Sequence, residues 1–110
     1  ADVQAMVGAL TGYLMASQET PAELYRVGLG SVPFLMACGD LLIGWLLLHH
    51  ADIATAALAD GAAERDVPFY EGKIAVGRFF ARNMLPLLSG VRETVGAVDG
   101  RVMEISEDSF

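Results

Sequence analysis

The chain has 110 residues, enough for one domain, and its hydrophobic fraction of 54% is high for a globular protein. The formal net charge is -7, from 14 acidic and 7 basic side chains, and this sign repels a phosphate-rich polymer and excludes nucleic acid as a partner. We therefore expect a soluble domain whose apolar surplus packs on something outside this sequence.

The start of the chain and its single cysteine bear on its origin. The first residues lack a basic segment followed by an apolar run, so we expect no signal peptide. The chain begins at Ala1 rather than at methionine, and we interpret residues 1–110 as a single accessory domain, a fragment of a longer polypeptide. Cys38 has no second cysteine to bridge, which favours a buried thiol in a reducing, cytoplasmic compartment.

The first predicted element is an amphipathic helix that ends near Ser17. Its apolar residues recur at steps of three and four, which aligns them on one helical face: Val3, Met6, Val7, Leu10 and Leu14. No segment of the chain alternates apolar and polar residues with β-branched enrichment, so no strand is predicted. The predicted fold class is all-α.

A second helix is predicted to begin at Pro21. Thr20 and Glu23 form a capping-box pattern around this proline, in which each side chain accepts a hydrogen bond from a free backbone N–H of the first turn. Pro33 lacks an N–H and clashes with the carbonyl four residues earlier. We therefore expect a kink or a short break near Gly30.

The longest apolar run of the sequence, Val27–Leu48, lies in this second helix and contains one charge, Asp40. A helix that is apolar all round normally occupies the centre of its bundle. We expect the helix to reach about Ala59, where Asp60 and Gly61 supply a stop.

A third helical stretch should begin at Pro68, bend one turn before Pro86 and end at Asp99 and Gly100. Its predicted inner seam consists of Tyr70, Ile74, Gly77, Ala81, Met84 and Leu88. The connections are short, so sequential helices should be antiparallel, in an up-and-down bundle of three long helices. Residues 101–110 form an acidic C-terminal tail, with four apolar anchors: Val102, Met103, Ile105 and Phe110.

The apolar run also meets the length of a membrane span, because Val27–Leu48 covers 22 residues. An aspartate near its middle would cost roughly 2.5 to 3.5 kcal/mol in hydrocarbon, and basic anchors are lacking at its flanks. We expect a buried core helix and no membrane span.

Asp40 then needs a partner, because a buried carboxylate without one is unstable. Our hypothesis is an ion pair across the bundle with Lys73, the only lysine, and the alternative is that each faces solvent. Arg78 and Arg82 lie one helical turn apart and could share an anion, although exposed arginines that solubilise the face explain them equally.

No residue pattern predicts catalysis or metal binding. His49 and His50 are adjacent and point about 100° apart, so they do not chelate one metal together. Asp52 shares a side with His49, but the additional glutamates of a di-iron site are missing. The sequence also lacks a nucleophile turn and a phosphate-binding glycine loop. We interpret the two histidines as a solvated helix surface and assign no metal, catalytic or cofactor ligand to this chain.

Several segments resemble the extra C-terminal helical domain of acyl-CoA dehydrogenase-like flavoenzymes. They are Phe69–Lys73, Arg78–Ala81 and Leu85–Pro86 in the third helix, and Val32–Leu35, Gly39, Gly44–Leu46 and Ala54–Ala57 in the second. The resemblance covers residues 24–110. Gly77 departs from it, because such domains more often have alanine at that position.

The resemblance implies a function for a larger enzyme rather than for this chain. In such oxidoreductases the substrate is a fatty acyl-CoA thioester, a glutamate removes the α-proton, and FAD accepts hydride from the β-carbon. These groups belong to other domains, so the expected partners are the rest of the dehydrogenase chain and a second subunit of a homo-oligomer. A non-enzymatic helical oligomerisation or interaction domain, and a small membrane-associated helical protein, stay open as alternatives.

Overall fold

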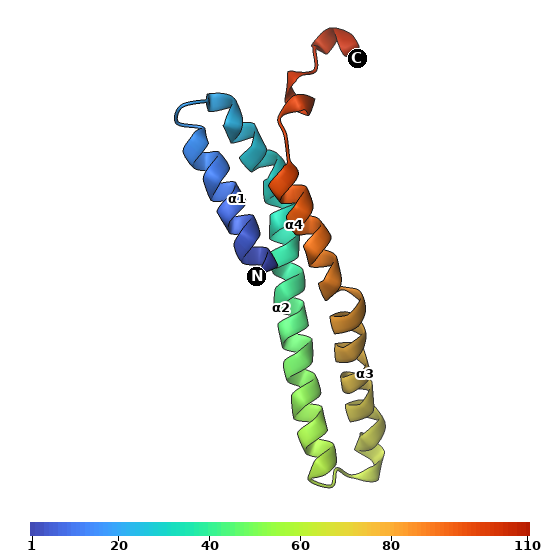
Figure 1. Ribbon diagram of the computed structural model, residues 1–110. Helices are drawn as coiled ribbons and strands as arrows, with labels where there is room; N and C mark the ends of the chain where they lie inside the picture. The colour runs from blue at the N-terminus through green and yellow to red at the C-terminus, as the bar shows by residue number, and fades with distance from the viewer. The chain divides into compact units, whose positions relative to one another are not determined.

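The computed structural model describes residues 1–110, and every regular element in it is a helix (Figure 1). The four α-helices are α1 (Asp2–Ala16), α2 (Leu24–Ala59), α3 (Val67–Asn83) and α4 (Leu88–Ala97). A short 3-10 turn, Leu85–Leu87, separates α3 from α4, so the interruption lies at Pro86 itself rather than one turn before it. The predicted all-α class with three helical stretches is therefore confirmed, and the third stretch consists of two α-helices.

The chain forms two compact units. The first comprises Ala1–Ala37 together with Leu88–Phe110, and the second comprises Cys38–Leu87. The first thus contains α1, α4 and the start of α2, and the second contains the rest of α2 with α3. Each unit is described by itself below.

In the first unit, α1 packs on α4 through a narrow inner face. Met6 and Tyr13 of α1 and Val95 of α4 are buried, and Leu10 contacts the backbone of α2 at Gly30. The predicted face of α1 is partly wrong, because Val7 and Leu14 are about half-exposed and Tyr13 takes the inner position. Tyr13 occupies the inner position because its hydroxyl finds hydrogen-bond acceptors there, the backbone carbonyls at the end of α4.

The predicted capping box before α2 is wrong. Pro21–Glu23 form a 3-10 turn, the side chain of Thr20 caps nothing, and the carboxylate of Glu23 accepts a hydrogen bond from Arg26 instead. The Thr20 carbonyl accepts the backbone N–H of Glu23, which closes the 3-10 turn. The carboxylate therefore prefers a charged donor one turn ahead to the neutral N–H behind it.

Helix α2 contains Pro33 in its interior and continues as one α-helix, so the short break expected near Gly30 is absent, while the kink given as the other possibility stays a prediction. It ends as the sequence predicts, at Ala59. Gly61 adopts a positive φ of 85°, the N–H of Gly61 donates to the Leu58 carbonyl, and the N–H of Ala62 donates to the Ala57 carbonyl. These two bonds form the Schellman motif, which satisfies carbonyls that the last turn leaves free.

In the second unit, α2 and α3 form an antiparallel hairpin whose closest approach is at Gly77. A β-carbon at this position would lie 3.0 Å from the carbonyl oxygen of Leu47 and 3.1 Å from the β-carbon of Ala51. Gly44 of α2 lies against the side chain of Leu85, where a β-carbon would be 2.8 Å from a methyl carbon. The predicted seam is confirmed, because each of its six residues is buried or half-buried.

Helix α2 turns small residues inward and large residues outward, contrary to the expected central position. The buried residues are small, namely Gly30, Ala37, Gly44, Ala51 and Ala54. Large apolar side chains on its other sides are exposed, including Leu35, Leu42, Trp45 and Ile53. Only 11% of the most apolar stretch is buried, and the helix with its preceding turn, Pro21–Ala59, is long and apolar enough to cross a membrane.

The tail consists of two 3-10 turns, Arg101–Glu104 and Glu107–Ser109. Its four predicted apolar anchors are all exposed, and none of them is part of the core.

Candidate functional site

A polar cluster in the first unit closes the carboxyl end of α4. The Tyr13 hydroxyl lies 3.0 Å from the Val95 carbonyl oxygen and 2.7 Å from that of Gly96, and it donates its proton to one of them at a time. Arg26 donates through Nε to the Val98 carbonyl at 2.7 Å. The last carbonyls of a helix lack partners within the helix, and a cation there is favoured by the helix dipole.

The guanidinium of Arg26 is held on three sides. Its Cζ atom lies 4.0 Å from the centre of the Tyr13 ring, and its Nη1 atom lies 2.8 Å from a carboxylate oxygen of Glu23. The Glu23 hydrogen bond raises the pKa of Arg26 above its ordinary value, so the side chain stays charged in any ordinary buffer. Every hydrogen bond of this cluster is made within the chain, so we interpret it as a structural cluster that holds α1, α2 and α4 together.

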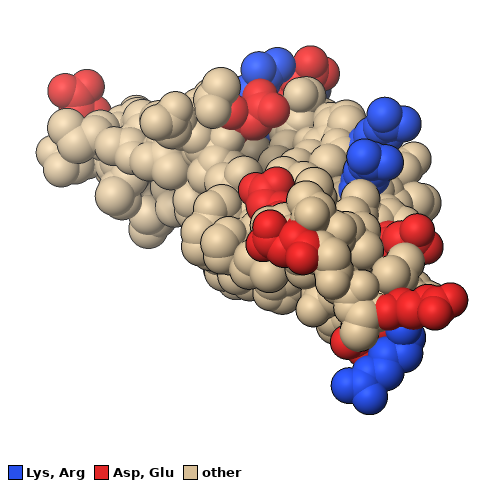
Figure 2. Space-filling view, turned by 90° about the horizontal axis from the view of Figure 1, so that it is seen from below, with Lys and Arg blue, Asp and Glu red and all other residues tan.

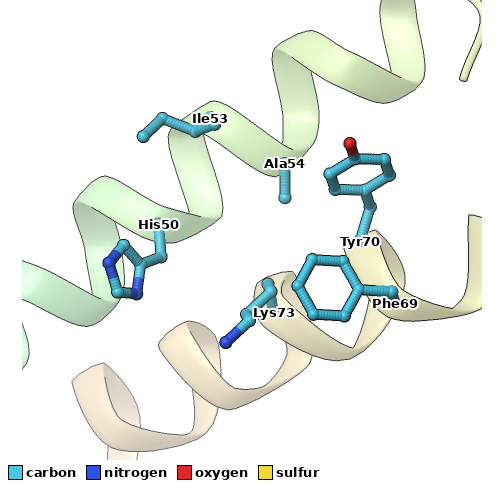
Figure 3. Close-up of a pocket in the computed structure, with 6 residues that line it drawn as sticks. All are labelled: His50, Ile53, Ala54, Phe69, Tyr70 and Lys73. Atoms are coloured by element: carbon cyan, nitrogen blue, oxygen red, sulfur yellow. The ribbon is translucent and has the colours of Figure 1, made fainter. Parts of the chain in front are cut away.

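A pocket of about 270 Å³ lies in the second unit between α2 and α3 (Figure 3). His50, Ile53 and Ala54 come from α2, and Phe69, Tyr70 and Lys73 come from the first turns of α3. The antiparallel hairpin brings these two groups together, because α2 ends and α3 begins at the same end of the unit. The walls are mainly apolar, and the polar groups are an imidazole, a phenol and an ammonium.

The ammonium of Lys73 interacts with an aromatic ring rather than with a carboxylate. Its Nζ atom lies 5.2 Å from the centre of the Phe69 ring, within the range of a cation–π contact. The pocket therefore offers an apolar hollow with one cation at its edge. Such a site suits an apolar side chain or a small amphipathic anion, and sequence reasoning missed it because His50, Phe69 and Tyr70 have no shared motif.

The structure does not bring Asp40 and Lys73 together. Lys73 lines the pocket beside His50, and Asp40 lies ten residues earlier on α2, about 15 Å along the helix axis. The hairpin register set by Gly77 is the reason. Asp40 is half-buried rather than fully buried, so its carboxylate is not cut off from water.

The remaining candidate residues lie on the surface. Arg78 and Arg82 are exposed on α3, and a shared anion between them stays a prediction. His49 stacks on the ring of Trp45 with the two planes 4° apart, and no group of three potential metal ligands is present in the structure. Cys38 is half-buried.

The only ion pair that joins distant helices was also missed by sequence reasoning. Asp2 in the first turn of α1 accepts hydrogen bonds from Arg92 at 3.0 Å and from the Ser89 hydroxyl at 3.2 Å, both on α4. An acidic residue in the first turn of a helix was the available signal, since the helix dipole favours it. Its partner 90 residues away has no local signature.

Charged side chains are otherwise sparse. Figure 2 shows broad areas of one side of the molecule with neither acidic nor basic side chains. Twenty-three large apolar side chains are exposed, and an exposed apolar area of this kind marks a surface that binds another surface.

Residues 1–106 match the family described as acetyl-CoA dehydrogenase C-terminal like. The chain is 56% identical over 109 residues to the broad-specificity linear acyl-CoA dehydrogenase FadE5 of Mycobacterium tuberculosis, covering 99% of this chain and 18% of that protein. It is 38% identical over 86 residues to 3-methylmercaptopropionyl-CoA dehydrogenase of Ruegeria pomeroyi, covering 77% of this chain and 14% of that protein. It is 32% identical over 85 residues to butyryl-CoA dehydrogenase of Syntrophomonas wolfei, covering 76% of this chain and 14% of that protein.

These matches define a helical domain of acyl-CoA dehydrogenases. The chain belongs to the family of acetyl-CoA dehydrogenase C-terminal-like domains. It spans less than a fifth of the length of the curated relatives that it matches. The resemblance predicted from the sequence is confirmed.

Proposed function

We propose that this chain is the C-terminal packing domain of an FAD-dependent dehydrogenase that oxidises acyl-CoA thioesters between the α- and β-carbons. The observation that carries the proposal is the match along 99% of the chain to a protein named as a linear acyl-CoA dehydrogenase. Two other matched proteins are named as a butyryl-CoA dehydrogenase and a 3-methylmercaptopropionyl-CoA dehydrogenase.

The hairpin pocket of this chain does not fit FAD. The hairpin pocket of about 270 Å³ is mainly apolar and lies below the usual range for sites that enclose a drug-sized ligand. The only cation that lines it, Lys73, lies over Phe69. We therefore assign the flavin and the acyl-CoA to the remainder of the polypeptide, and no step of the oxidation to a residue of this chain.

The packing role follows from how the second unit distributes its side chains. Gly44, Gly77 and Ala51 allow the two helices of the hairpin to approach closely, and the large apolar residues are left on the outside. A domain with this distribution gains stability when another surface covers it. A homo-oligomer and a cytoplasmic location belong to the same proposal, the second because the unpaired Cys38 favours a reducing compartment.

Purification of the full protein from its natural gene tests the proposal. We expect a yellow protein with about one FAD per subunit, whose visible flavin absorption bleaches when a straight-chain acyl-CoA is added without oxygen. A protein that contains no flavin after mild purification, or a flavin that acyl-CoA does not reduce, would contradict the proposal.

A second candidate, a membrane-associated helical protein, is favoured by one observation, the length and apolar character of Pro21–Ala59. Asp40 within this helix argues against it, because a carboxylate in hydrocarbon is unfavourable. Extraction of the full protein from cells separates the two candidates. A dehydrogenase domain predicts recovery without detergent, and the membrane candidate predicts that detergent is required.

A further inference from the structure

Helix α3 carries two different exposed stripes, one on each side of the residue that touches α2. Successive residues advance about 100° around a helix, so positions on either side of Gly77 separate clearly. The apolar stripe consists of Phe69, Val76 and Phe79, which are 61, 52 and 63% exposed. The charged stripe consists of Glu71, Arg78 and Arg82, with the exposed Ala75 among them. On α3 itself, one side is therefore suited to water and the other is not.

Helix α2 extends the apolar stripe across the pocket. Ile53 and Phe69 line the same pocket, so Ile53 lies on the side of the hairpin that carries the apolar stripe of α3. Leu46 lies two turns before Ile53 on the same side, and Ile43 lies one turn before Leu46. All three are exposed. Together these residues form what we call the apolar face: Ile43, Leu46, Ile53, Phe69, Val76 and Phe79.

We propose that the apolar face docks on the dehydrogenase body of the same polypeptide, with the charged stripe of α3 left in water. The inference rests on the proposed function. Its first support is length, because more than four-fifths of the matched relative lies outside the region that this chain covers. Its second support is the packing of the second unit. Helix α3 covers the small-residue side of α2, and this unit contains no further α-helix that could cover the other sides.

The pocket specifies the chemistry of the docked segment. The pocket is a hollow within the apolar face. One apolar side chain of the dehydrogenase body fills it, as in knobs-into-holes packing between helices. The ammonium of Lys73 at its edge pairs with no carboxylate of this chain. An acidic side chain or a carbonyl of the body beside that apolar residue complements it.

Two neighbouring substitutions in the full flavoprotein test the inference. Val76→Asp places a carboxylate on the apolar face, and Ala75→Asp places the same group about 100° away, on the charged stripe. Both positions are exposed in the unit itself, Val76 at 52%, so neither substitution places a carboxylate in the core of the unit. We expect hydrogen exchange of the α3 amides to accelerate at least about tenfold in Val76→Asp and to stay within about twofold in Ala75→Asp. Val76→Ile should keep the wild-type exchange.

The other outcomes overturn the inference. Equal exchange in the two aspartate variants would mean that the body does not cover this face. Loss of a subunit contact in Val76→Asp, seen by light scattering with unchanged α3 exchange, would assign the face to a second copy. Loss of binding to anionic phospholipid vesicles would assign it to a bilayer. FAD content and its reduction by acyl-CoA, measured on the wild-type sample, report separately on the proposed function.

Discussion

At the scale of single residues, the hydroxyl of Tyr13 and the absent side chain of Gly77 have structural roles that their residue types alone do not reveal. The first closes the end of α4, and the second sets the distance between α2 and α3. Each role depends on atoms that are distant in sequence. Each can be tested by a substitution, with the same substitution at another tyrosine or glycine as the control.

Tyr13→Phe removes the hydroxyl and keeps the ring under Arg26. The carbonyls at the end of α4 lose a donor in a partly buried place, so the free energy of unfolding should fall by about 1 kcal/mol. Tyr25→Phe is the control, because Tyr25 is half-exposed. Urea titration of both variants measures the difference. An equal effect of the two substitutions would show that the Tyr13 hydroxyl does not stabilise α4.

Gly77→Leu should force α3 away from the backbone of α2, because the carbonyl oxygen of Leu47 cannot move aside as a flexible side chain can. We expect a loss of roughly 1 to 3 kcal/mol in unfolding free energy, the usual effect of overpacking. Gly72→Leu on the same helix has open space around it and should gain up to about 1 kcal/mol from helix propensity. Thermal unfolding distinguishes these opposite signs, and a stabilised Gly77→Leu would contradict the described helix contact.

At the scale of elements, the sequence predicted each helix and missed how several of them begin and pack. The stop after Ala59 and the seam of α3 were predictable because both rest on local signals, a glycine after an apolar run and a repeat of three and four. The capping box was wrong because Arg26 competes for Glu23, and a pattern of four residues does not include that competitor. The uninterrupted passage of α2 through Pro33 shows that one proline need not end a long helix.

The Schellman motif at the end of α2 gives a prediction at this scale. Gly61→Ala introduces a β-carbon where φ is 85°, so the free energy of unfolding should fall by roughly 1 to 2 kcal/mol. Gly8→Ala, in the middle of α1 with open space around it, should raise it by up to about 1 kcal/mol. Differential scanning calorimetry of the two variants tests the motif. A gain in Gly61→Ala would show that the turn after α2 does not require a glycine.

At the scale of the whole molecule, the composition predicted that the apolar surplus packs on a partner. The apolar run of α2 predicted, in addition, that this helix lies at the centre of a bundle. The structure shows instead that α2 is covered on its small-residue side and exposed on its large-residue side. Neither hydrophobicity nor periodicity distinguishes these cases, because the sequence does not contain the surface that would cover the outer side. The structure contains no ion pair of Asp40 with Lys73, and the residue pattern did not indicate which residues of α2 the close contact at Gly77 would face.

The most direct test of the central claim is product analysis with the full protein. Incubation with a straight-chain acyl-CoA without oxygen should convert it to a thioester lighter by two hydrogens, one product per flavin reduced, as mass spectrometry and absorption on the same sample would show. An unchanged acyl-CoA beside a fully oxidised flavin would contradict the assignment of this chain to an active acyl-CoA dehydrogenase.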